Sequence, residues 1–453
     1  MRLLLLLPLL AVLIGCERPF IEPASPTVEV VSPVDLSVVR SQPTLPLAFR
    51  ATTVFGAIDR IEVNGIAATF LRDEDLYLDT LQLAAGLNRI VVEAFTEAGT
   101  VGGDTLFAVY LPARFASVAA QLPTPLGGHA AATLLDGTTL LTGGAASVTD
   151  TAQDGALLFD PRDFSFATLP EGMAQARVGH VASRLPDGRV LITGGSRRLD
   201  PADLDAFVTE VELFDPATNT FSTVPVVAAD SGTVAPIRRT EHTVTVLQGD
   251  NGQISVYLYG GIGNLGTLSE PVIGALPFMR RLRFEEGPAG PRLVVPDRSE
   301  GFRFTAIARH TQTPVSDIGA DGFGRYLVAG ASDPSDPDVA APFELVFARS
   351  FLDALAVGPL QEPRTDAASA PLADGLVLVT GGAGPESGTV RPSGEVFTSE
   401  AGVFFQFAED VRLAIPRWGH TATNVGADRI LLVGGFSAAG QALARTELFV
   451  GTP

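Results

Sequence analysis

The chain has 453 residues, a formal net charge of −20 and a pI near 4.6. So acidic a chain is a poor partner for nucleic acid, and we expect no nucleic-acid binding. Its 46 percent of hydrophobic residues can fill a core in several domains, and 47 glycines with 33 prolines are typical of a turn-rich, all-β chain. A single cysteine excludes an intrachain disulfide.

The N-terminus has the pattern of a signal peptide. Arg2 precedes an apolar run over 3–14, which is shorter than the about 20 residues of a membrane-spanning helix. Leu13-Ile14-Gly15-Cys16 resembles the bacterial lipobox, and this resemblance implies cleavage after residue 15 and a lipid on Cys16. The alternative is an ordinary secretory signal with a chance cysteine. We predict a lipoprotein signal peptide over 1–15, a lipidated cysteine and proline-rich tether over 16–26, and anchoring in the bacterial cell envelope, at the outer membrane or cell surface rather than the inner membrane.

Residues 27–111 predict a small β-domain. Short apolar segments alternate with turn residues about every ten positions, and Asn64-Gly65 is typical of a tight hairpin turn. The segment resembles a bacterial Ig-like β-sandwich, a kind of domain that commonly acts as a spacer. A binding role is the alternative.

The rest of the chain, 112–453, repeats one motif. The stretch "RVGHVASRLPDGRVLITGG" (177–195) has counterparts around every histidine, namely His129, His180, His242, His310 and His420, and a sixth copy carries Ala367 in that place. The copies begin about 50 to 70 residues apart, a period typical of propellers and other repeat arrays.

Each copy predicts a four-stranded sheet. Asp187-Gly188 is a hairpin turn signal between two alternating apolar segments, which places His180 opposite Gly195. Third and fourth strands follow, such as "VELFDP" (211–216) and "FSTVP" (221–225). Glycine at the facing position leaves room for the histidine ring. The second strands end in a diglycine in five copies: Gly143, Gly144, Gly194, Gly195, Gly260, Gly261, Gly381, Gly382, Gly434 and Gly435.

These residues resemble the kelch motif of the superfamily that includes the central domain of galactose oxidase. The resemblance covers about 113–453 and implies a six-bladed β-propeller, although phenylalanine replaces the usual fourth-strand tryptophan and the fourth copy reads Gly330-Ala331. The last copy lacks a fourth strand, so we expect 114–123 to complete it and close the ring.

The recurring histidines are interpreted as structural hydrogen-bonding residues. A ring of imidazoles that binds a metal or anion is the alternative, which Ala367 would interrupt. The copper chemistry of galactose oxidase uses a cysteine-linked tyrosine, and here Cys16 is the only cysteine. We therefore expect no metal, no cofactor and no catalytic residue.

Two acidic loops are weaker candidates for calcium, which prefers six to eight oxygen ligands. Solvated turns are the alternative interpretation. The candidate ligands are Asp200, Asp203, Asp205, Asp333, Asp336 and Asp338.

The sequence thus predicts an all-β protein with an Ig-like sandwich and a six-bladed kelch-like propeller. Its predicted function is that of a lipid-anchored binding or scaffold protein for a protein or glycan partner. The alternative is a carbohydrate-active enzyme or sugar-binding protein that uses the central pocket, which a convergent set of acids and arginines there would favour. Long connections at 224–239, 262–280 and 285–303 border the third repeat and are candidate partner-binding loops.

Overall fold

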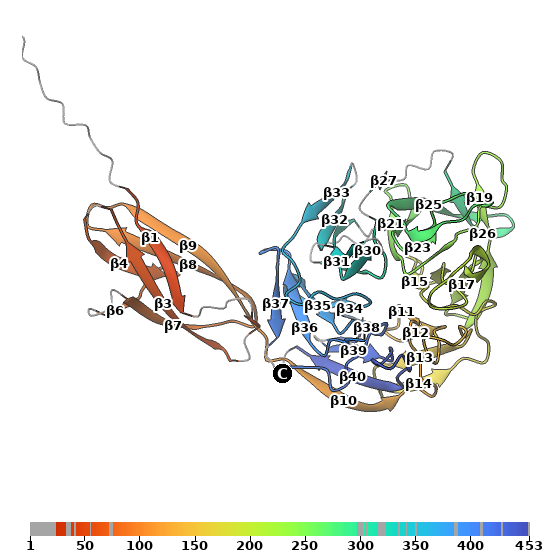
Figure 1. The fold of residues 1–453 in the computed structure, drawn as a ribbon, viewed down its shortest axis with the longest axis horizontal. Coiled ribbons are helices and arrows are strands. Elements are labelled where there is room, and N and C mark those ends of the chain that lie inside the picture. The colour runs from red at the N-terminus through yellow and green to blue at the C-terminus, as the bar shows by residue number, and fades with distance from the viewer. Residues whose placement is uncertain are drawn as a thin grey trace, which may run out of the picture. The chain divides into compact units, whose positions relative to one another are not determined.

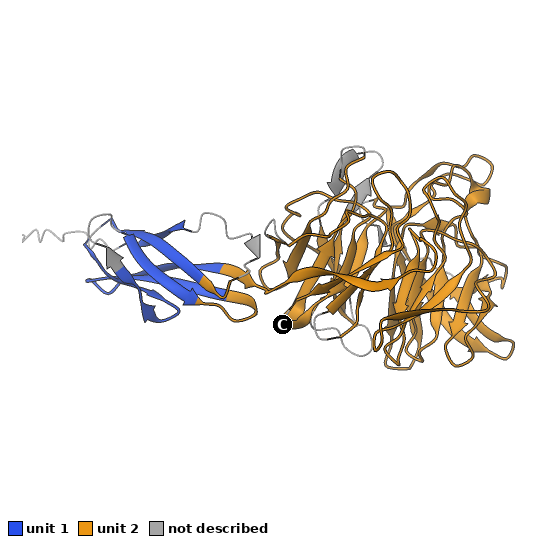
Figure 2. Ribbon diagram, turned by 90° about the horizontal axis from the view of Figure 1, so that it is seen from below, with its two compact units in different colours: residues 1–34, 45–81, 89–106 blue, residues 35–44, 82–88, 107–453 orange. Residues whose placement is uncertain are grey.

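The protein is all-β and divides into two compact units (Figure 2). This computed structural model describes residues 24–32, 38–39, 42–54, 56–71, 76–296, 302–303, 306–315, 323–333, 336–340, 342–348, 351–384, 388–407, 411–426 and 429–451. Unit 1 comprises residues 1–34, 45–81 and 89–106, and unit 2 comprises residues 35–44, 82–88 and 107–453. The predicted all-β class is confirmed. The predicted signal peptide, Cys16 and most of the tether lie outside the described residues.

Unit 1 holds most of two four-stranded sheets, with strand orders β1-β3-β7-β6 and β5-β4-β8-β9. Buried and partly exposed residues alternate along β8, where Ile90, Val92 and Ala94 point into the core. Asn64 and Gly65 both have positive φ and join β4 to β5 as a tight turn. The strands are β1 (Thr27–Ser32), β3 (Thr44–Thr52), β4 (Ile58–Val63), β5 (Ile66–Ala67), β6 (Thr69–Leu71), β7 (Leu76–Gln82), β8 (Gly86–Thr96) and β9 (Val101–Tyr110).

Unit 2 contains six antiparallel sheets of four main strands, numbered here as sheets 1 to 6 in the order of their histidine motifs. Sheet 1 consists of β11 (Ala130–Thr133), β12 (Thr139–Thr142), β13 (Ala156–Asp160) and β14 (Ser165–Thr168). Sheet 2 consists of β15 (Val181–Arg184), β16 (Val190–Thr193), β17 (Val211–Asp215) and β18 (Thr220–Val224). Sheet 3 consists of β21 (Thr243–Gln248), β22 (Ile254–Tyr259), β25 (Phe278–Gly287) and β26 (Gly290–Val295).

The other three sheets repeat this antiparallel order. Sheet 4 consists of β28 (Thr311–Pro314), β29 (Gly324–Ala329), β32 (Phe343–Ala348) and β33 (Phe351–Ala356). Sheet 5 consists of β34 (Ala368–Pro371), β35 (Leu376–Thr380), β36 (Gly394–Thr398) and β37 (Val403–Phe407). Sheet 6 consists of β38 (Thr421–Asn424), β39 (Arg429–Val433), β40 (Arg445–Val450) and β10 (Arg114–Gln121).

The fourth strand of sheet 6 comes from the start of unit 2. β10 pairs antiparallel with β40, so that Arg114 lies opposite Val450 and Ser117 lies opposite Glu447. Two segments more than 300 residues apart in the chain therefore share one sheet. The edge that β40 would otherwise leave unpaired is covered.

The six sheets lie side by side around a common centre (Figure 1). Their first strands contact one another in the cycle β11, β15, β21, β28, β34, β38 and back to β11. A cluster of buried apolar side chains fills the space between each pair of neighbouring sheets. The second strands β12, β16 and β35 are buried at every position because both of their faces are covered.

The connections around sheet 3 differ in part from the sequence interpretation. Residues 285–303 are not one long connection, because Gly287 and Gly290 close a tight turn and Gly290–Val295 forms the fourth strand. The segment 224–239 adds β19 (Val226–Ala228), which runs parallel to β26. The segment 262–280 does form an insertion, in which β23 (Ile262–Asn264) pairs with β24 (Ile273–Ala275) and with β20 (Arg239–Thr240).

The remaining short elements of unit 2 pair with main strands or with one another, apart from two 3₁₀ turns. β2 pairs with β37, β27 pairs with β25, and β30 pairs with β31. Their bounds are β2 (Val38–Val39), β27 (Phe302–Arg303), β30 (Ala331–Asp333) and β31 (Asp336–Ala340), and two 3₁₀ turns are η1 (Leu204–Ala206) and η2 (Ala373–Gly375).

Candidate functional site

The residue immediately before each motif histidine occupies the same backbone conformation in all six sheets. Its φ lies between 52° and 67°, in the left-handed region that strongly favours glycine. Glycine is present in sheets 1, 2 and 6, whereas sheets 3, 4 and 5 carry charged residues there. These six ring residues are Gly128, Gly179, Glu241, Arg309, Asp366 and Gly419.

The ring residues are joined by a closed cycle of six backbone hydrogen bonds. In each, the N–H of one ring residue donates to the carbonyl of the ring residue in the preceding sheet. Glu241 donates to Gly179 at 2.8 Å, Arg309 to Glu241 at 3.1 Å and Asp366 to Arg309 at 2.9 Å. The cycle is completed by Gly419 to Asp366 at 2.8 Å, Gly128 to Gly419 at 2.8 Å and Gly179 to Gly128 at 3.0 Å. This arrangement fixes the six residues next to one another.

The cycle brings three charged side chains from consecutive sheets to one side of the ring. Arg309 forms an ion pair with Asp200, which comes from the connection between β16 and β17. Asp366 accepts a hydrogen bond from the Thr365 hydroxyl at 3.1 Å. The Glu241 carboxyl lies over Gly179, where an added Cβ would come within 2.5 Å of Oε1. All three charged ring residues remain partly exposed.

The electrostatics of this cluster favour an added positive charge. Burial raises the pKa of the Glu241 carboxyl to about 8, and the negative charge of Asp366 adds to the rise. Burial also raises the pKa of Asp366, although Arg309 opposes this effect. The pKa of Arg309 is raised, chiefly by Asp366. Glu241 therefore holds a proton near neutral pH, while Arg309 stays cationic.

Two of the three ring glycines, Gly128 and Gly419, lie against apolar side chains. An added Cβ on Gly128 would lie 2.5 Å from a methyl of Val178, and one on Gly419 would lie 3.3 Å from the ring of Phe436. The Phe436 ring packs against Trp418 with centroids 4.8 Å apart. Any side chain at these two glycines would fill this space, so the ring has a charged half and, at Gly128 and Gly419, an apolar and aromatic side.

Two hollows open at the ring. The smaller one, about 120 Å³, is lined by the ring residues, Ala367 and the five motif histidines. The larger one, about 460 Å³, is lined by Arg309, Asp366 and Trp418 together with residues 383–384, 388–390 and 438–440. This combination of an aromatic wall with a few charged groups is typical of small-ligand sites.

The five histidines are buried and bonded between sheets. Each Nε2 shares a hydrogen bond with a threonine hydroxyl of the preceding sheet, as for His180 and Thr142 at 2.8 Å or His420 and Thr380 at 3.0 Å. The side chains are 4 to 7 percent exposed. Burial lowers the pKa of His129 to about 4 and that of His310 to about 3, so both rings are neutral at neutral pH.

The diglycines make room for these rings. Gly195 lies against the Cβ of His180, because an added Cβ there would be 2.9 Å away. The predicted register is off by one residue, however: Val181 pairs with Thr193 around a three-residue turn, so the ladder places His180 opposite Gly194. The imidazole ring itself packs against Gly143 of sheet 1, with 2.6 Å between an added Cβ and Cε1. The contact between neighbouring sheets recurs at Gly194, Gly260, Gly381 and Gly434. The contact within one sheet recurs at Gly261, Gly435 and Gly144, which meet His242, His420 and His129, while Gly382 meets Ala367.

Among the solved structures with a similar fold is that of YjhT. The two share 16 percent sequence identity with a TM-score of 0.51, and the match covers 72 percent of this chain and 95 percent of the other. No family model and no curated protein matches the sequence. The likeness therefore concerns the fold alone.

A recurring buried ion pair was not singled out from the sequence. Arg177 is fully buried, donates from Nη1 to the Gly194 carbonyl at 2.9 Å and pairs with Glu212 of β17. Sheets 5 and 6 repeat the pair as Arg364 with Glu395 and Arg417 with Glu447. The repeated signal is an arginine three residues before the histidine and a glutamate within the third strand.

The calcium candidates are dispersed over different contacts. Asp200 pairs with Arg309, and Asp203 caps η1 by accepting from the Ala206 N–H at 3.0 Å. Asp205 is exposed in the first turn of η1. Asp333 lies on β30, and Asp336 and Asp338 lie on β31, with side chains outside the described part. Within the residues that the structure describes, no group of three or more histidine, cysteine or acidic side chains is placed to hold a metal ion.

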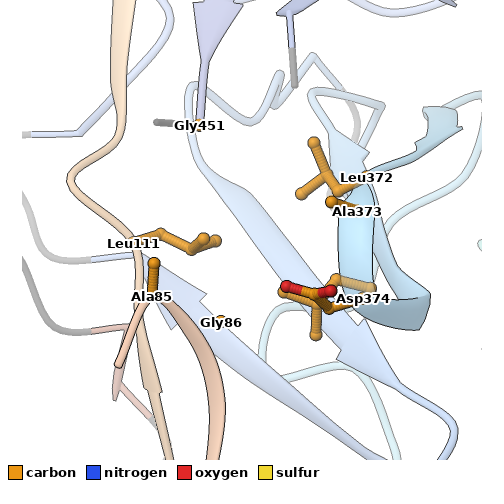
Figure 3. A pocket seen from close by; sticks show the side chains of 8 residues that line it. Ala85, Gly86, Leu111, Leu372, Ala373, Asp374 and Gly451 are labelled. Carbon is orange, nitrogen blue, oxygen red and sulfur yellow. The ribbon is translucent and has the colours of Figure 1, made fainter. Parts of the chain in front are cut away.

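A further hollow in unit 2 is too small for an organic ligand. It holds about 20 Å³, room for one water molecule, between residues 85–86 and the β34–β35 turn. Figure 3 shows Asp374 facing Ala85 and Gly86 across it.

Among the described residues, no helix is long and apolar enough to cross a membrane.

Proposed function

We propose that the chain is a lipid-anchored protein of the bacterial cell envelope whose six repeats form a kelch-like β-propeller that binds a glycan at its centre. The closed cycle of first-strand contacts, the inter-sheet cores and the fold likeness to YjhT, a propeller-type protein, support the architecture. The lipobox resemblance supports the anchor, and the two sheets of residues 27–111 support an Ig-like spacer.

The observation that carries the binding function is the replacement of glycine by charged residues at the ring. A non-glycine residue in the left-handed conformation costs about 1–2 kcal/mol, and Glu241, Arg309 and Asp366 adopt it in three consecutive sheets. Backbone strain of this kind clusters at functional sites because the surrounding structure must maintain it. The three side chains serve no repeat-wide structural purpose, since glycine takes the same place elsewhere.

The chemistry of the hollow favours a glycan over an extended protein surface. Carboxyl and guanidinium groups match vicinal hydroxyls by hydrogen bonding, and the Trp418 side provides an apolar wall for the face of a sugar ring. A volume of about 460 Å³ falls within the range of small-molecule sites. This convergence of acids and an arginine favours sugar binding over a scaffold with a featureless centre.

A glycan array tests this function. The full-length chain in detergent micelles is compared with a triple variant, Glu241→Gly, Arg309→Gly and Asp366→Gly, that restores the glycine of the other sheets. We expect the native chain to bind a restricted set of glycans and the folded triple variant to lose them. Identical glycan profiles for the two proteins would place binding elsewhere.

One other surface favours a protein partner as a second candidate function. The insertion over 262–280 exposes three aliphatic side chains, Leu265, Leu268 and Val272, of which Leu268 is 72 percent exposed. Exposed apolar groups on a loop of a rigid scaffold are typical of interaction sites. Replacing 262–280 by a tight turn tests this role, because a folded variant that still captures its partner excludes the loop.

A further inference from the structure

The charged half of the ring holds more carboxylates than cations. Glu241, Asp366 and Asp200 surround Arg309, and the Arg309 guanidinium is already paired with Asp200. Within the described part of the chain, Glu241 accepts no hydrogen bond, and Asp366 accepts one, from Thr365. Two carboxyl groups thus face the hollow without a bonded cation.

The raised pKa values have the same origin. Burial makes the charged forms of Glu241 and Asp366 unfavourable. The charge of Asp366 adds repulsion at Glu241, the charge of Asp200 adds repulsion at Asp366, and Glu241 holds a proton near neutral pH. A ligand that brings its own positive charge can replace that proton. An anionic ligand would meet the same repulsion.

A second, independent feature also calls for hydrogen-bond donors. Thr243 donates its hydroxyl proton to the Gln312 side-chain carbonyl at 2.7 Å, and the Gln312 amide in turn donates to Thr245. The 2.9 Å bond between Thr243 and His310 must therefore use the Nε2–H of the histidine as donor. Nδ1 of His310 is then a bare acceptor.

That acceptor is buried and has no partner among the described residues, and His310, 7 percent exposed as a whole residue, lines the smaller hollow. The Nδ1 atoms of the other four histidines are likewise buried and unpartnered there. His310 thus places one bare acceptor in the wall of the smaller hollow, which Glu241 and Asp366 also line. Both features favour a ligand rich in N–H donors.

The opposite wall suits the carbon skeleton of such a ligand. Trp418 is partly exposed in the larger hollow, which Arg309 and Asp366 also line. Its indole N–H donates to the Ser437 carbonyl at 3.3 Å, which orients the ring. An aromatic face attracts an adjacent ammonium as well as apolar C–H groups.

We propose, on the basis of the proposed glycan-binding function, that the sugar recognised at the ring carries a free primary ammonium group. The ammonium lies between the carboxyl groups of Asp366 and Glu241, and the sugar ring lies toward Trp418. The ligand is an amino sugar that is not acetylated. Arg309, held by Asp200, contacts hydroxyl groups rather than an anion.

Titration calorimetry with three probes tests the ligand class. Glucosamine, N-acetylglucosamine and glucose are titrated at pH 6, where the glucosamine amine is protonated, into the full-length chain in micelles. We expect the dissociation constant of glucosamine to be at least about tenfold below that of the other two sugars. In Asp366→Asn this preference falls to about threefold or less. Asp230→Asn, at an exposed residue, is the matched control and is expected to keep the full preference for glucosamine.

The outcomes separate this inference from the function on which it rests. If the three sugars bind alike, and Asp366→Asn weakens all of them equally, the ammonium inference is wrong and the glycan site stands. The ammonium inference is also wrong if glucosamine does not bind, or if neither Asp366→Asn nor the triple glycine variant changes the affinity for any of the three sugars. If the triple variant in addition binds the glycan array like the native chain, the proposed glycan-binding function at the ring is wrong as well. Melting temperatures exclude misfolding as the cause.

Discussion

Replacing Glu241 by glycine is expected to stabilise the protein. Glu241 has a φ of 53°, which costs a non-glycine residue about 1–2 kcal/mol, whereas glycine loses about 0.5–1 kcal/mol more backbone entropy on folding. The net gain is about 0.5–1 kcal/mol. For a unit of this size, the unfolding entropy is about 0.7 kcal/mol/K, so Tm rises by about 1 °C.

The stabilisation by Glu241→Gly is also expected to depend on pH, which distinguishes it from other small shifts in Tm. The pKa of Glu241 is about 8 in the folded protein, above the value of about 4.5 in the unfolded chain. The folded state therefore binds the extra proton, and the cost of burying this carboxyl grows as pH rises from about 4.5 to 8 and is constant above. The gain from Glu241→Gly grows over the same window.

Chemical denaturation between pH 5 and pH 9 measures the effect more sensitively than Tm. Glu241→Ala serves as one control, because it removes the carboxyl but keeps the strained conformation. Gly419→Ala is the reverse control: it introduces the strain at an equivalent ring residue, beside Phe436, and is expected to destabilise. If Glu241→Gly destabilises the protein at every pH, Glu241 is a structural residue and the reasoning fails.

Three further predictions concern other parts of the chain. Thr142→Val leaves Nε2 of buried His180 without its hydrogen-bond partner at 2.8 Å and is expected to lower the free energy of unfolding by about 1–3 kcal/mol. An unchanged denaturation midpoint would show that this bond contributes nothing to stability. The free energy of unfolding should fall as pH drops from 6.5 toward 4, because His129 and His310 stay neutral in the folded protein while the unfolded chain takes up protons. The fall is up to about 1.4 kcal/mol per pH unit for each buried histidine. His310→Gln should reduce this slope, and an unchanged slope would contradict the assignment of His310 as a buried, neutral residue. Cys16→Ser should leave the precursor unprocessed and without lipid label, and normal labelled protein from this variant would disprove the lipoprotein prediction.

The strand order of the six sheets could be predicted from the sequence because the same motif recurs in each repeat. The hairpin turn at Asp187-Gly188 follows from local spacing, but its exact length does not. Leu185 and Arg189 close a three-residue turn, so His180 lies opposite Gly194 and not, as predicted, Gly195. The last repeat lacks a fourth strand, which predicts that 114–123 completes its sheet, and β10 lies there.

The charged ring could not be derived in the same way. The motif strings place Glu241, Arg309 and Asp366 before a histidine or its alanine replacement, but each looks like an ordinary surface substitution by itself. What distinguishes these three residues is the positive φ of that position and the closed cycle of hydrogen bonds that brings the three sheets together. Both are tertiary properties, although glycine in the other three copies is a signal that could have revealed them.

The strand β26 was missed for a different reason. Residues 287–292 are rich in glycine and proline, which by local propensity indicate a connection. The pairing of β25 with β26, and the buried Leu293 and Val294 on it, override this propensity. Packing against sheet 2 supplies the free energy that the turn-rich sequence lacks.

A crystal structure of the chain with its best glycan from the array tests the ring site most directly. We predict density for the sugar in the larger hollow, in contact with Arg309, Asp366 and Trp418. Density for the sugar on the 262–280 insertion or on unit 1, with the ring left free, would contradict a ligand site at the centre of the six sheets.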